Sequence, residues 1–516
     1  MKIDPYLNYD SGLMNPYVHG EVFVTEDGGE TDLDIGRYER FLGTMLSKKN
    51  NITTGQVYLE VIQRERRGDF LGKCVQIIPH VTEEIGRRIR EAVKIPGAEV
   101  GIVEIGGTVG DIEGMPFLEA VRQMRLEEGE GNTLIAHVAL VPLLETVDEY
   151  KTKPLQHSVQ ELRRIGLQPD LIFVRSKGAP PEEVMAKVAL FSSVDRRYAF
   201  AATDLRSVYE LPRYLEDQGL GKVLCSKLRM ERREPDWGDW DKSVEGILGP
   251  KDSVRIALVG KYVTMRDSYI SVIDALRHAG GKVGVRAKVE MIEAEELEKS
   301  NDVTTALAGT HGILAPGGFG KRGAEGKMMA MKYARERGIP FLELCYGFQL
   351  AAVEFARNAL GLEGANSTEV DPESPHPVVH ISEDQLGVSQ MGGTQRLGAS
   401  KVKLKPGSMA HRIYRREEVF ERHRHRYEVN ADYADRLEKS GLEPVGFSED
   451  GRIEILALSG HPFYFATQFH PEFKSWPGAP NPCFYAFVSA AYRMMKGDPV
   501  RPDAADFSYP SQVLAL

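Results

Sequence analysis

Cys345 stands in a sequence pattern that could make it a nucleophile. The segment PFLELCYGFQLAAVEFA (340–356) combines a short apolar strand, which runs into the cysteine, with an amphipathic helix that leaves it. A strand-to-helix turn would place the thiol at the carboxyl edge of a sheet. It would also lie beside a helix N-terminus, whose positive dipole end favours a thiolate. We therefore predict that this cysteine attacks an electrophilic carbon.

A base for that thiol could come from YFATQFHPEF (464–473), which supplies His470 and Glu472. A cysteine nucleophile needs a base to take its proton, and the base needs a carboxylate to orient it. Because side chains two residues apart in an extended segment point the same way, we expect both on one face. A lone buried cysteine is more often a core residue. The turn and the His-Pro-Glu sequence together nevertheless favour a Cys–His–Glu triad.

The segments PGGFG (316–320), CYG (345–347) and QFHPEF (468–473) together resemble the class I glutamine amidotransferases. The resemblance implies cleavage of the glutamine amide through a cysteine thioester, with release of ammonia. It makes Cys345 the nucleophile, His470 the base and Glu472 its orienting group. Backbone N–H groups around Gly318 and Tyr346 would form the oxyanion hole. The residues that the resemblance assigns to glutamine binding are Gly318, Tyr346, Gly347, Phe348, Gln349, Glu369 and Arg426.

Glu343 departs from the pattern of that family. Members usually have glycine two residues before the nucleophile, and glycine serves where a backbone turns tightly or another group approaches closely. Here the residue is a glutamate. We expect its carboxylate to crowd the turn, or to raise the pKa of the Cys345 thiol through like charge.

His423 and His425 in RHRHRYEVN (422–430) raise the alternative of a metal site. An HxH pair on a strand can bind a metal ion, but three arginines alternate with these histidines and their charge opposes a cation. We favour an anion-facing or substrate-carboxylate role for the segment.

Three motifs of the first half combine charged side chains with turns. DGGETDLDIGRYERF (27–41) holds five acidic residues, and VEIGGTVGDIEGMPF (103–117) places Glu104 at a predicted strand end before a glycine-rich turn. Such carboxylates hold Mg²⁺ and nucleotide phosphates in α/β domains, although an acidic cluster is more often a solvated loop. KTKPLQHS (151–158) is a rigid basic turn suited to phosphate oxygens.

Taken together, these motifs resemble the CTP synthase family, and the match runs from Lys2 to about residue 495. It also includes HGEVFVTEDG, ANSTE and GGTQRLG in the family's order. The resemblance implies an α/β fold with a P-loop-type amidoligase domain followed by a class I glutamine amidotransferase domain. It implies a ligase of pyrimidine biosynthesis, in which ATP phosphorylates the 4-oxygen of UTP. Ammonia from glutamine then displaces the phosphate to give CTP.

The same resemblance implies roles for residues of the first half. Asp34 and Glu104 would hold Mg²⁺, and His19 would lie at the ammonia passage. Lys2, Asp34 and Arg175 would bind ATP. Leu155 stands where the family usually has threonine, which puts one nucleotide contact in question. The residues assigned to UTP and product CTP are Asp111, Ile112, Glu113, Lys151, Thr152, Lys153, Pro154, Leu155, Gln156 and Lys187.

The resemblance also implies cofactors and an assembly. Mg²⁺ would serve as cofactor, ATP as co-substrate and GTP as an activator. The chain would form a homotetramer, a dimer of dimers, with nucleotide sites at the subunit interfaces.

The start of the chain differs from the family. Members carry a first strand and a GGVVSSLGKG-type phosphate loop ahead of the position that matches Met1, and no G-x-x-x-x-G-K-[ST] sequence occurs elsewhere. We expect this strand and loop to be absent, through a misassigned start codon, a truncated chain or a natural variant. Two alternatives to the ligase then stay open: a nucleotide-binding regulatory or assembly subunit, and an uncoupled glutaminase.

The candidate site residues must be positioned by the secondary structure around them. In the first half, strand-like and helix-like segments alternate, and this alternation predicts a mainly parallel sheet. A Trp-, Asp- and Pro-rich stretch near residue 235 interrupts the alternation, and VRIALVGKY opens a second α/β unit. The predicted domains are 1–235, a linker at 236–253 with a short helix, 254–497 and a loosely held tail at 498–516. The predicted strands of the first half are 20–25, 56–62, 98–107, 133–142 and 169–176, with helices at 81–93 and 116–127. Those of the second half are 254–262, 312–320, 339–347, 454–460 and 464–473.

Composition agrees with a soluble multidomain enzyme or scaffold of the cytoplasm. The 516 residues exceed one ordinary core, and a 42% hydrophobic content excludes general disorder. The net charge of −10 argues against a nucleic-acid-binding surface. No long apolar run or signal peptide predicts a membrane association. The scattered cysteines fit a reducing compartment; they are Cys74, Cys225, Cys345 and Cys483.

Overall fold

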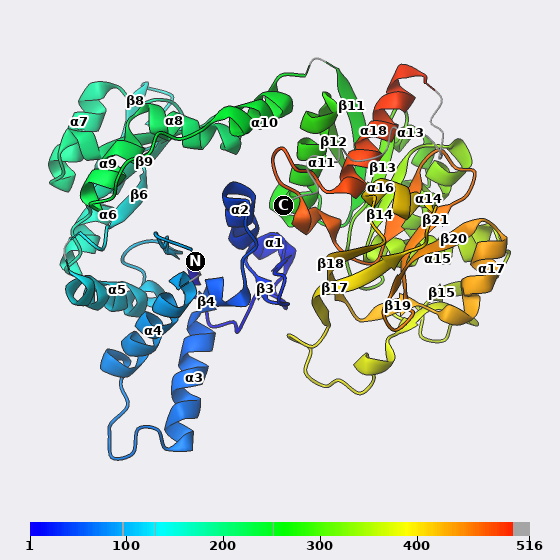
Figure 1. The fold of residues 1–516 in the computed structure, drawn as a ribbon, viewed down its shortest axis with the longest axis horizontal. Helices are drawn as coiled ribbons and strands as arrows, with labels where there is room; N and C mark the ends of the chain where they lie inside the picture. Colours follow the sequence, from blue (N-terminus) through cyan, green and yellow to red (C-terminus); the bar gives the residue numbers. More distant parts are fainter. Residues whose placement is uncertain (95–96, 130, 251, 499–516) are drawn as a thin grey trace. The chain divides into compact units, whose positions relative to one another are not determined.

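The computed structural model describes residues 1–94, 97–129, 131–250 and 252–498 (Figure 1). The chain forms two units, described separately below. Unit 1 consists of Met1–Asp10 and Lys49–Trp237, and unit 2 consists of Ser11–Lys48 and the chain from Gly238 onward. The predicted tail lies outside the described residues except for Asp498. The predicted domain limits stay a prediction, and Ser11–Lys48 packs with the second half although it precedes most of the first.

Unit 1 contains two three-stranded parallel sheets, so the predicted parallel pairing is confirmed, but the strands form two sheets instead of one. Their strand orders are β4-β1-β5 and β10-β9-β6, and a hairpin, β7–β8, follows β6. The strands are β1 (Lys2–Asp4), β4 (Asn51–Thr53), β5 (Glu104–Ile105), β6 (Ala136–Leu140), β7 (Leu143–Leu144), β8 (Glu149–Tyr150), β9 (Leu171–Ser176) and β10 (Ala199–Thr203).

Helices surround these sheets. Those predicted at 81–93 and 116–127 are confirmed as α4 and α5. The helices are α3 (Thr54–Arg67), α4 (Thr82–Val93), α5 (Met115–Glu128), α6 (Lys153–Arg164), α7 (Glu182–Ser192), α8 (Leu211–Asp217) and α9 (Leu220–Lys227). Short helical turns lie at η1 (Lys48–Asn50), η2 (Ile77–Val81), η3 (Ile112–Gly114), η4 (Arg196–Tyr198) and η5 (Val208–Glu210).

The strand predicted at 56–62 is wrong, because this segment belongs to helix α3. The Thr53 hydroxyl accepts the Gln56 N–H at 3.1 Å and caps the helix N-terminus. Val57 and Val61, four residues apart, are buried on one face of the helix. The content of β-branched residues therefore favoured a strand, whereas the cap and the spacing of the buried positions produce a helix.

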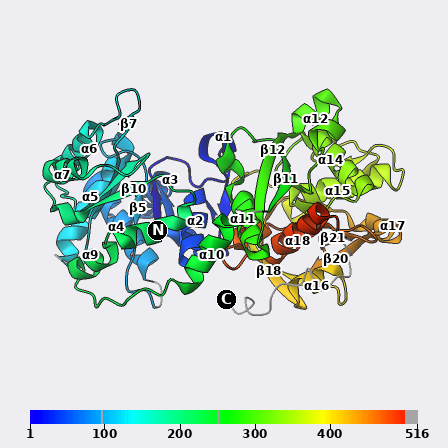
Figure 2. The same cartoon turned by 90° about the horizontal axis from the view of Figure 1, so that it is seen from above.

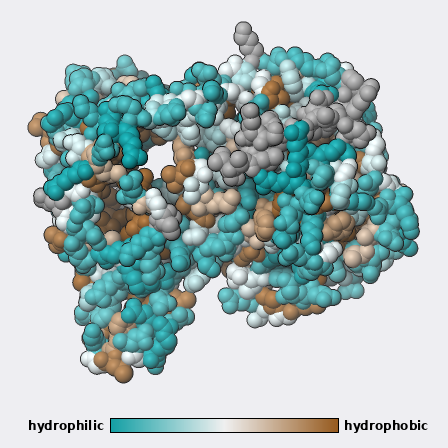
Figure 3. Space-filling view, viewed as in Figure 1, coloured by the Kyte–Doolittle hydropathy of each residue, from teal (hydrophilic) through white to brown (hydrophobic). Residues whose placement is uncertain are grey.

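The strand predicted at 98–107 is much shorter than expected, since only Glu104 and Ile105 are strand residues. The strand predicted at 133–142 is confirmed as β6, an edge strand with Val138 and Leu140 exposed on one side. Figure 3 shows apolar surface on unit 1 at the level of this strand. The expected absence of a preceding strand and phosphate loop stays a prediction.

Unit 2 is built on a nine-stranded sheet of order β12-β11-β13-β14-β22-β21-β20-β17-β18. The first five strands are parallel and the rest antiparallel. The strands are β11 (Ser253–Gly260), β12 (Arg286–Glu293), β13 (Gly312–Ala315), β14 (Phe341–Leu344), β17 (Arg396–Leu404), β18 (Glu418–His425), β20 (Leu442–Ser448), β21 (Ile453–Leu458) and β22 (Tyr464–Thr467). Smaller sheets contain β2 (Phe23–Val24), β3 (Glu30–Thr31), β15 (Ala365–Ser367), β16 (His376–Ile381) and β19 (Tyr427–Val429).

Helices cover both faces of the nine-stranded sheet (Figure 2). One buried core contains residues of α11 and α18, and the other contains residues of α14 and α15. The predicted linker is largely a helix, α10, which packs on α11. The helices are α1 (Pro16–His19), α2 (Leu33–Leu42), α10 (Gly238–Leu248), α11 (Ile270–Val283), α12 (Ala294–Ser300), α13 (Val303–Ala306), α14 (Ala324–Arg337), α15 (Tyr346–Asn358), α16 (Met409–Tyr414), α17 (Ala434–Lys439) and α18 (Pro482–Lys496). Helical turns lie at η6 (Arg266–Tyr269), η7 (Glu383–Gln385), η8 (Ala431–Tyr433) and η9 (Pro471–Lys474).

No helix among the described residues combines the length and the apolarity needed to cross a bilayer.

Candidate functional site

Cys345 lies at the turn between β14 and α15, where the sequence pattern predicts it. Its backbone has φ 50° and ψ −100°, a conformation that non-glycine residues rarely adopt. The Cys345 N–H donates to the Thr467 carbonyl at 2.7 Å, which fixes the turn to the neighbouring strand β22. A strained, hydrogen-bonded turn of this kind holds the thiol in one position.

His470 and Glu472 form the contact that a triad requires. The distance from His470 Nδ1 to Glu472 Oε1 is 2.7 Å, and both side chains are buried. Burial alone would lower the pKa of His470, but the Glu472 carboxylate and Cys345 raise it to about 10. The expectation of an extended segment is wrong, because Pro471–Lys474 forms a 3₁₀ turn. Proline after His470 favours that turn, and the turn still brings both side chains together.

Gly317 lies against the triad. A Cβ atom added to this glycine would come within 2.9 Å of His470 Cε1 and 3.7 Å of Cys345 Cβ. The loop 316–320 therefore approaches the thiol and the imidazole as closely as van der Waals contact allows, which only glycine permits.

We expect Gly317→Ala to slow glutamine hydrolysis by about 10²-fold, because the added methyl group displaces the imidazole from the thiol. The measurement is ammonia release from glutamine under saturating substrate. Gly114→Ala, at a glycine of unit 1 where an added Cβ atom would meet nothing within 4 Å, is the matched control and should keep the rate. A variant with unchanged glutaminase activity would show that His470 can move without cost.

Gly347 is also required by close packing. A Cβ atom at this position would lie 2.5 Å from the Ala315 carbonyl oxygen. Because the first turn of α15 packs directly on the end of β13, this residue brings the helix N-terminus up to the loop 316–320.

The predicted glutamine-binding residues of this unit surround the same loop and helix end. Gln349 Nε2 donates to the Tyr427 carbonyl at 2.8 Å. Glu369 Oε1 accepts the Gly320 N–H at 2.7 Å, and burial raises the pKa of this carboxyl. Arg426 donates to Thr394 Oγ1 at 2.8 Å. Gly318, Tyr346, Gly347 and Phe348 form the loop and the first turn of α15 themselves.

Glu343 lies in strand β14 rather than in the turn. Its side chain is completely buried, and neither carboxyl oxygen has a hydrogen-bond partner among the described residues. Burial raises the pKa of this carboxyl well above its usual range. The raised pKa favours the neutral form of this carboxyl, which weakens the like-charge effect on the thiol that the sequence suggests.

Two of the three arginines of RHRHRYEVN, Arg422 and Arg424, face carboxylates of the chain itself. Arg422 is fully buried and pairs with both oxygens of Glu39, at 3.0 and 3.2 Å. Arg424 Nε donates to Glu30 Oε1 at 2.8 Å. These pairs attach segment 11–48 to β18, and the Arg422 carbonyl accepts the His470 N–H at 2.8 Å. The anion-facing role favoured from the sequence is thus met by glutamates within unit 2.

We expect Arg422→Met to lower the free energy of unfolding by about 3–5 kcal/mol, because it leaves the buried Glu39 carboxylate without its partner. Burial already raises the pKa of Glu39, and the Arg422 charge opposes that rise. Urea unfolding of the whole chain measures the loss. Arg436→Met, on the exposed face of α17, is the matched control. Equal unfolding midpoints for both variants would contradict this assignment.

His423 and His425 contact each other rather than a metal-binding group of three ligands. The distance from His423 Nδ1 to His425 Nε2 is 3.1 Å, and burial lowers the pKa of both histidines well below the usual value. Across the described ranges, no group of three or more potential metal ligands occurs.

The predicted nucleotide-binding residues lie on several elements of unit 1. Asp111, Ile112 and Glu113 are exposed at η3, and Lys187 is exposed on α7. Leu155 is buried, so its side chain belongs to the core and not to a surface that a nucleotide could contact. The remaining members follow the hairpin into the first turn of α6; they are Lys151, Thr152, Lys153, Pro154 and Gln156.

The residues predicted for ATP, metal and ammonia are divided between the units. In unit 1, Lys2 Nζ lies 3.3 Å from Glu104 Oε1, and Arg175 pairs with Asp204. In unit 2, Asp34 opens helix α2, and His19 ends α1 with its Nδ1 3.8 Å from Asp32 Oδ2. Carboxylate oxygens such as those of Glu104, half-exposed at a strand end, suit the hard ion Mg²⁺ by donor type.

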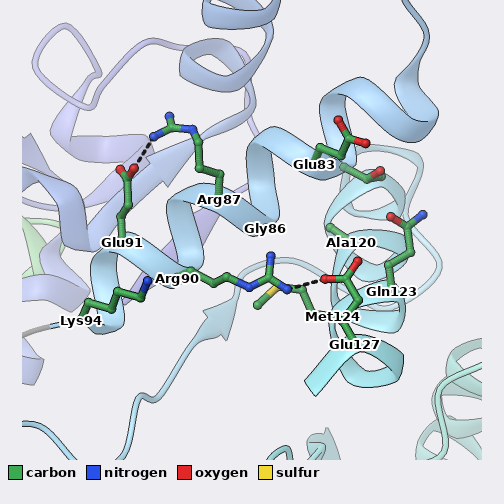
Figure 4. Close-up of a pocket in the computed structure, with 11 residues that line it drawn as sticks. Glu83, Gly86, Arg87, Arg90, Glu91, Lys94, Ala120, Gln123, Met124 and Glu127 are labelled. Carbon is green, nitrogen blue, oxygen red and sulfur yellow. Dashed lines mark hydrogen bonds and ion pairs between the residues drawn. The ribbon is translucent and has the colours of Figure 1, made fainter. Parts of the chain in front are cut away.

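A hollow of about 310 Å³ lies between α4 and α5 (Figure 4). Charges of both signs surround it, with Arg87 paired to Glu91 and Arg90 to Glu127. None of the residues predicted for substrate, cofactor or metal lines it. We therefore give this hollow no part in the predicted sites.

Sequence reasoning missed three residues at this site: Gly317, which lies within the loop 316–320, and Lys261 and Lys327, which contact the loop. Gly317 could have been recognised from its place in PGGFG, next to the predicted Gly318. The lysines carry no comparable signal, because a lysine on a predicted helix or at a strand end is normally exposed.

Two families match the chain. The family described as the CTP synthase N-terminus matches residues 1–230, and the family described as class I glutamine amidotransferase matches residues 264–490. The two matches together cover both units.

Curated relatives match nearly the whole chain. The CTP synthase of Sulfurisphaera tokodaii is 54% identical over 491 residues, which span 95% of this chain and 92% of that protein. The CTP synthase of Thermus thermophilus is 53% identical over 497 residues, 95% of this chain and 90% of that protein. A solved structure of the Trypanosoma brucei CTPS glutaminase domain with bound acivicin is 39% identical. It covers 46% of this chain and 94% of its own, with a TM-score of 0.44.

Proposed function

Because the chain belongs to the CTP synthase family, we propose that it forms CTP from UTP, with ATP as co-substrate and glutamine as the source of ammonia. The observation that carries the proposal is the Cys345 turn beside the His470–Glu472 contact of 2.7 Å. These residues lie in the part that matches the glutamine amidotransferases, and the preceding part matches the CTP synthase N-terminus. The two half-reactions are therefore assigned to the two halves of the chain.

In the glutaminase half-reaction, Cys345 Sγ attacks the carboxamide carbon of glutamine. His470 carries the proton that leaves the thiol and gives it to the departing ammonia, while Glu472 holds the imidazole in position. The N–H groups around Gly318 and Tyr346 donate to the oxyanion. Gln349, Glu369 and Arg426, with Gly347 and Phe348, hold the glutamine. Water then hydrolyses the thioester and releases glutamate.

In the synthase half-reaction, the γ-phosphoryl group of ATP is transferred to the 4-oxygen of UTP, and ammonia displaces the phosphate at that carbon. Lys2 and Arg175 bind ATP, and His19 lies on the path of the ammonia. Asp34 and Glu104 are the residues that would hold Mg²⁺, which would neutralise phosphate charge during phosphoryl transfer. The UTP and CTP pocket is assigned to the 111–113 and 151–156 segments with Lys187.

Activation by GTP, a homotetramer and a cytoplasmic location belong to the same proposal. No observation favours the regulatory or assembly subunit. An uncoupled glutaminase would have the same triad, so the reaction itself has to distinguish it from the ligase.

The test is CTP formation from UTP, ATP and Mg²⁺ by the purified chain, with ammonia and with glutamine in parallel. CTP from both donors is the expected result. Ammonia release from glutamine without CTP from either donor would identify an uncoupled glutaminase. UTP binding without any turnover would contradict the proposal and favour a binding subunit.

A further inference from the structure

The loop 316–320 is held by side chains from four different parts of unit 2. Lys327 Nζ donates to the Pro316 carbonyl at 2.7 Å, and Lys261 Nζ donates to the Phe319 carbonyl. The Tyr346 hydroxyl donates to the Gly320 carbonyl at 2.6 Å. Glu369 accepts the Gly320 N–H at 2.7 Å. The peptides at both ends of the loop are therefore held by side chains, on either side of the adjacent glycines Gly317 and Gly318.

The Phe319–Gly320 peptide shows what such contacts do. In a trans peptide the carbonyl and the N–H point in opposite directions. Lys261 binds the carbonyl of this peptide group and Glu369 binds its N–H, so the plane of the peptide group is held against rotation from both sides.

The Pro316–Gly317 peptide is held at its carbonyl end only. Lys327 binds that carbonyl, and within the described residues the Gly317 N–H donates to no protein acceptor. Glycine tolerates either sign of φ, so a Pro-Gly-Gly backbone without this anchor can turn a carbonyl towards the thiol at small cost. A carbonyl there would present its negative end to a forming oxyanion.

Lys327 has no other evident reason to be where it is. It lies on α14 with its side chain completely buried, a position that lysine rarely takes. A Cβ atom on Gly318 would lie 3.8 Å from Lys327 Nζ, so the ammonium group lies directly behind the residue predicted to donate to the oxyanion. Its Nζ also lies 5.3 Å from the centre of the Tyr346 ring.

We propose that Lys327 is a positioning residue of glutamine hydrolysis, which anchors the Pro316 carbonyl and so keeps the Gly317 N–H, in the same peptide plane, directed at the oxyanion of the intermediate bound to Cys345. The inference rests on the glutaminase half-reaction proposed above. Lys327 does not contact the substrate. It acts through the loop, in the transition state more than in the bound glutamine complex.

The electrostatic surroundings agree with this role. Burial and the nearby Lys261 lower the pKa of Lys327 to about 7, whereas Cys345, Glu293 and Glu343 oppose the decrease. A buried lysine that is costly to charge is retained where its donor is needed.

The experiment compares Lys327→Met, which keeps the length and loses the donor, with Lys327→Gln, which keeps a shorter N–H donor. We expect kcat for glutamine hydrolysis to fall about 10- to 100-fold in the methionine variant, less than the loss of a direct oxyanion donor. The glutamine variant should lose less. KM for glutamine should stay nearly constant, because the interaction is made in the transition state. Lys332→Met, exposed on the same helix, is the matched control.

A second readout uses glutamate γ-semialdehyde. The Cys345 sulfur adds to its aldehyde carbon, the C=O π bond breaks, and the oxygen takes the oxyanion position. Lys327→Met should weaken binding of the semialdehyde by the same factor by which it lowers kcat/KM for glutamine. Glutamine binding to Cys345→Ala chains should not change when Lys327→Met is added.

Two results would overturn the inference. One is a folded Lys327→Met chain with unchanged kcat and unchanged semialdehyde binding. The other is a loss confined to KM, which would make Lys327 a substrate-binding residue. A wild-type chain that releases no ammonia from glutamine would instead refute the proposed glutaminase, so the two failures can be distinguished.

Discussion

Cys345→Ala abolishes CTP formation from glutamine and leaves CTP formation from ammonia intact: this is the largest effect that we expect from a single substitution. The thioester forms on Cys345 Sγ, and alanine has no nucleophile to replace it. Loss of a nucleophile that acts with its base as a unit costs about 10⁴–10⁶-fold in rate. Added ammonia bypasses this step, so the synthase half-reaction should keep its rate. Parallel assays of CTP with the two nitrogen donors measure the difference.

Cys74→Ala is the matched control, because Cys74 is an exposed free cysteine of unit 1. It should leave both activities unchanged. Loss of ammonia-dependent synthesis in a folded Cys345→Ala chain would contradict the division of labour between the two halves. Residual glutamine-dependent CTP at the wild-type rate would remove Cys345 from the mechanism altogether.

The catalytic turn could be predicted from the sequence because its signal is local. A four-residue apolar strand, Cys345 and an amphipathic helix follow one another directly, and the structure forms β14, the turn and α15 in that order. Segment 56–62 shows where local pattern fails. Its valines suit a strand, but the Thr53 cap and the burial of Val57 and Val61 on one face make it part of α3.

The features of the site that could not be predicted from the sequence depend on contacts between residues far apart in the chain. Arg422 and Arg424 read as a positive patch, yet they pair with glutamates almost 400 positions earlier in the chain. The Lys327 contact with Pro316 depends on how α14 packs beside β13, and no spacing in the sequence encodes that distance. Glu343 looked like an obstacle to the turn, whereas its side chain is accommodated in the core of unit 2.

Glu472→Gln should reduce kcat for glutamine hydrolysis by about 10³–10⁴-fold, as expected for the orienting carboxylate of a triad. Burial lowers the pKa of His470, and the Glu472 charge contributes most, together with Cys345, to raising it to about 10. An amide keeps the shape but removes the charge. Burial is then opposed by Cys345 without the Glu472 charge, so the pKa of His470 falls and the imidazolium that protonates the leaving ammonia is less populated at neutral pH.

The pH profile of this variant supplies the sharper test. In the wild type, the raised pKa means that His470 stays protonated until the pH approaches 10, so the alkaline limb of glutaminase activity should lie there. In Glu472→Gln the alkaline limb should move to lower pH.

The pH dependence of the stability of the folded chain should follow from the same raised pKa of His470. A pKa raised above the unfolded value contributes stability that is fully present below about pH 6.5 and is lost as the pH rises through 10. The variant should lack that loss. Glu449→Gln, at an exposed glutamate that pairs with Lys401 on the surface, is the control and should leave both profiles unchanged. An unshifted alkaline limb in Glu472→Gln would mean that another group donates the proton, and Glu472 would then only support the 3₁₀ turn that follows His470.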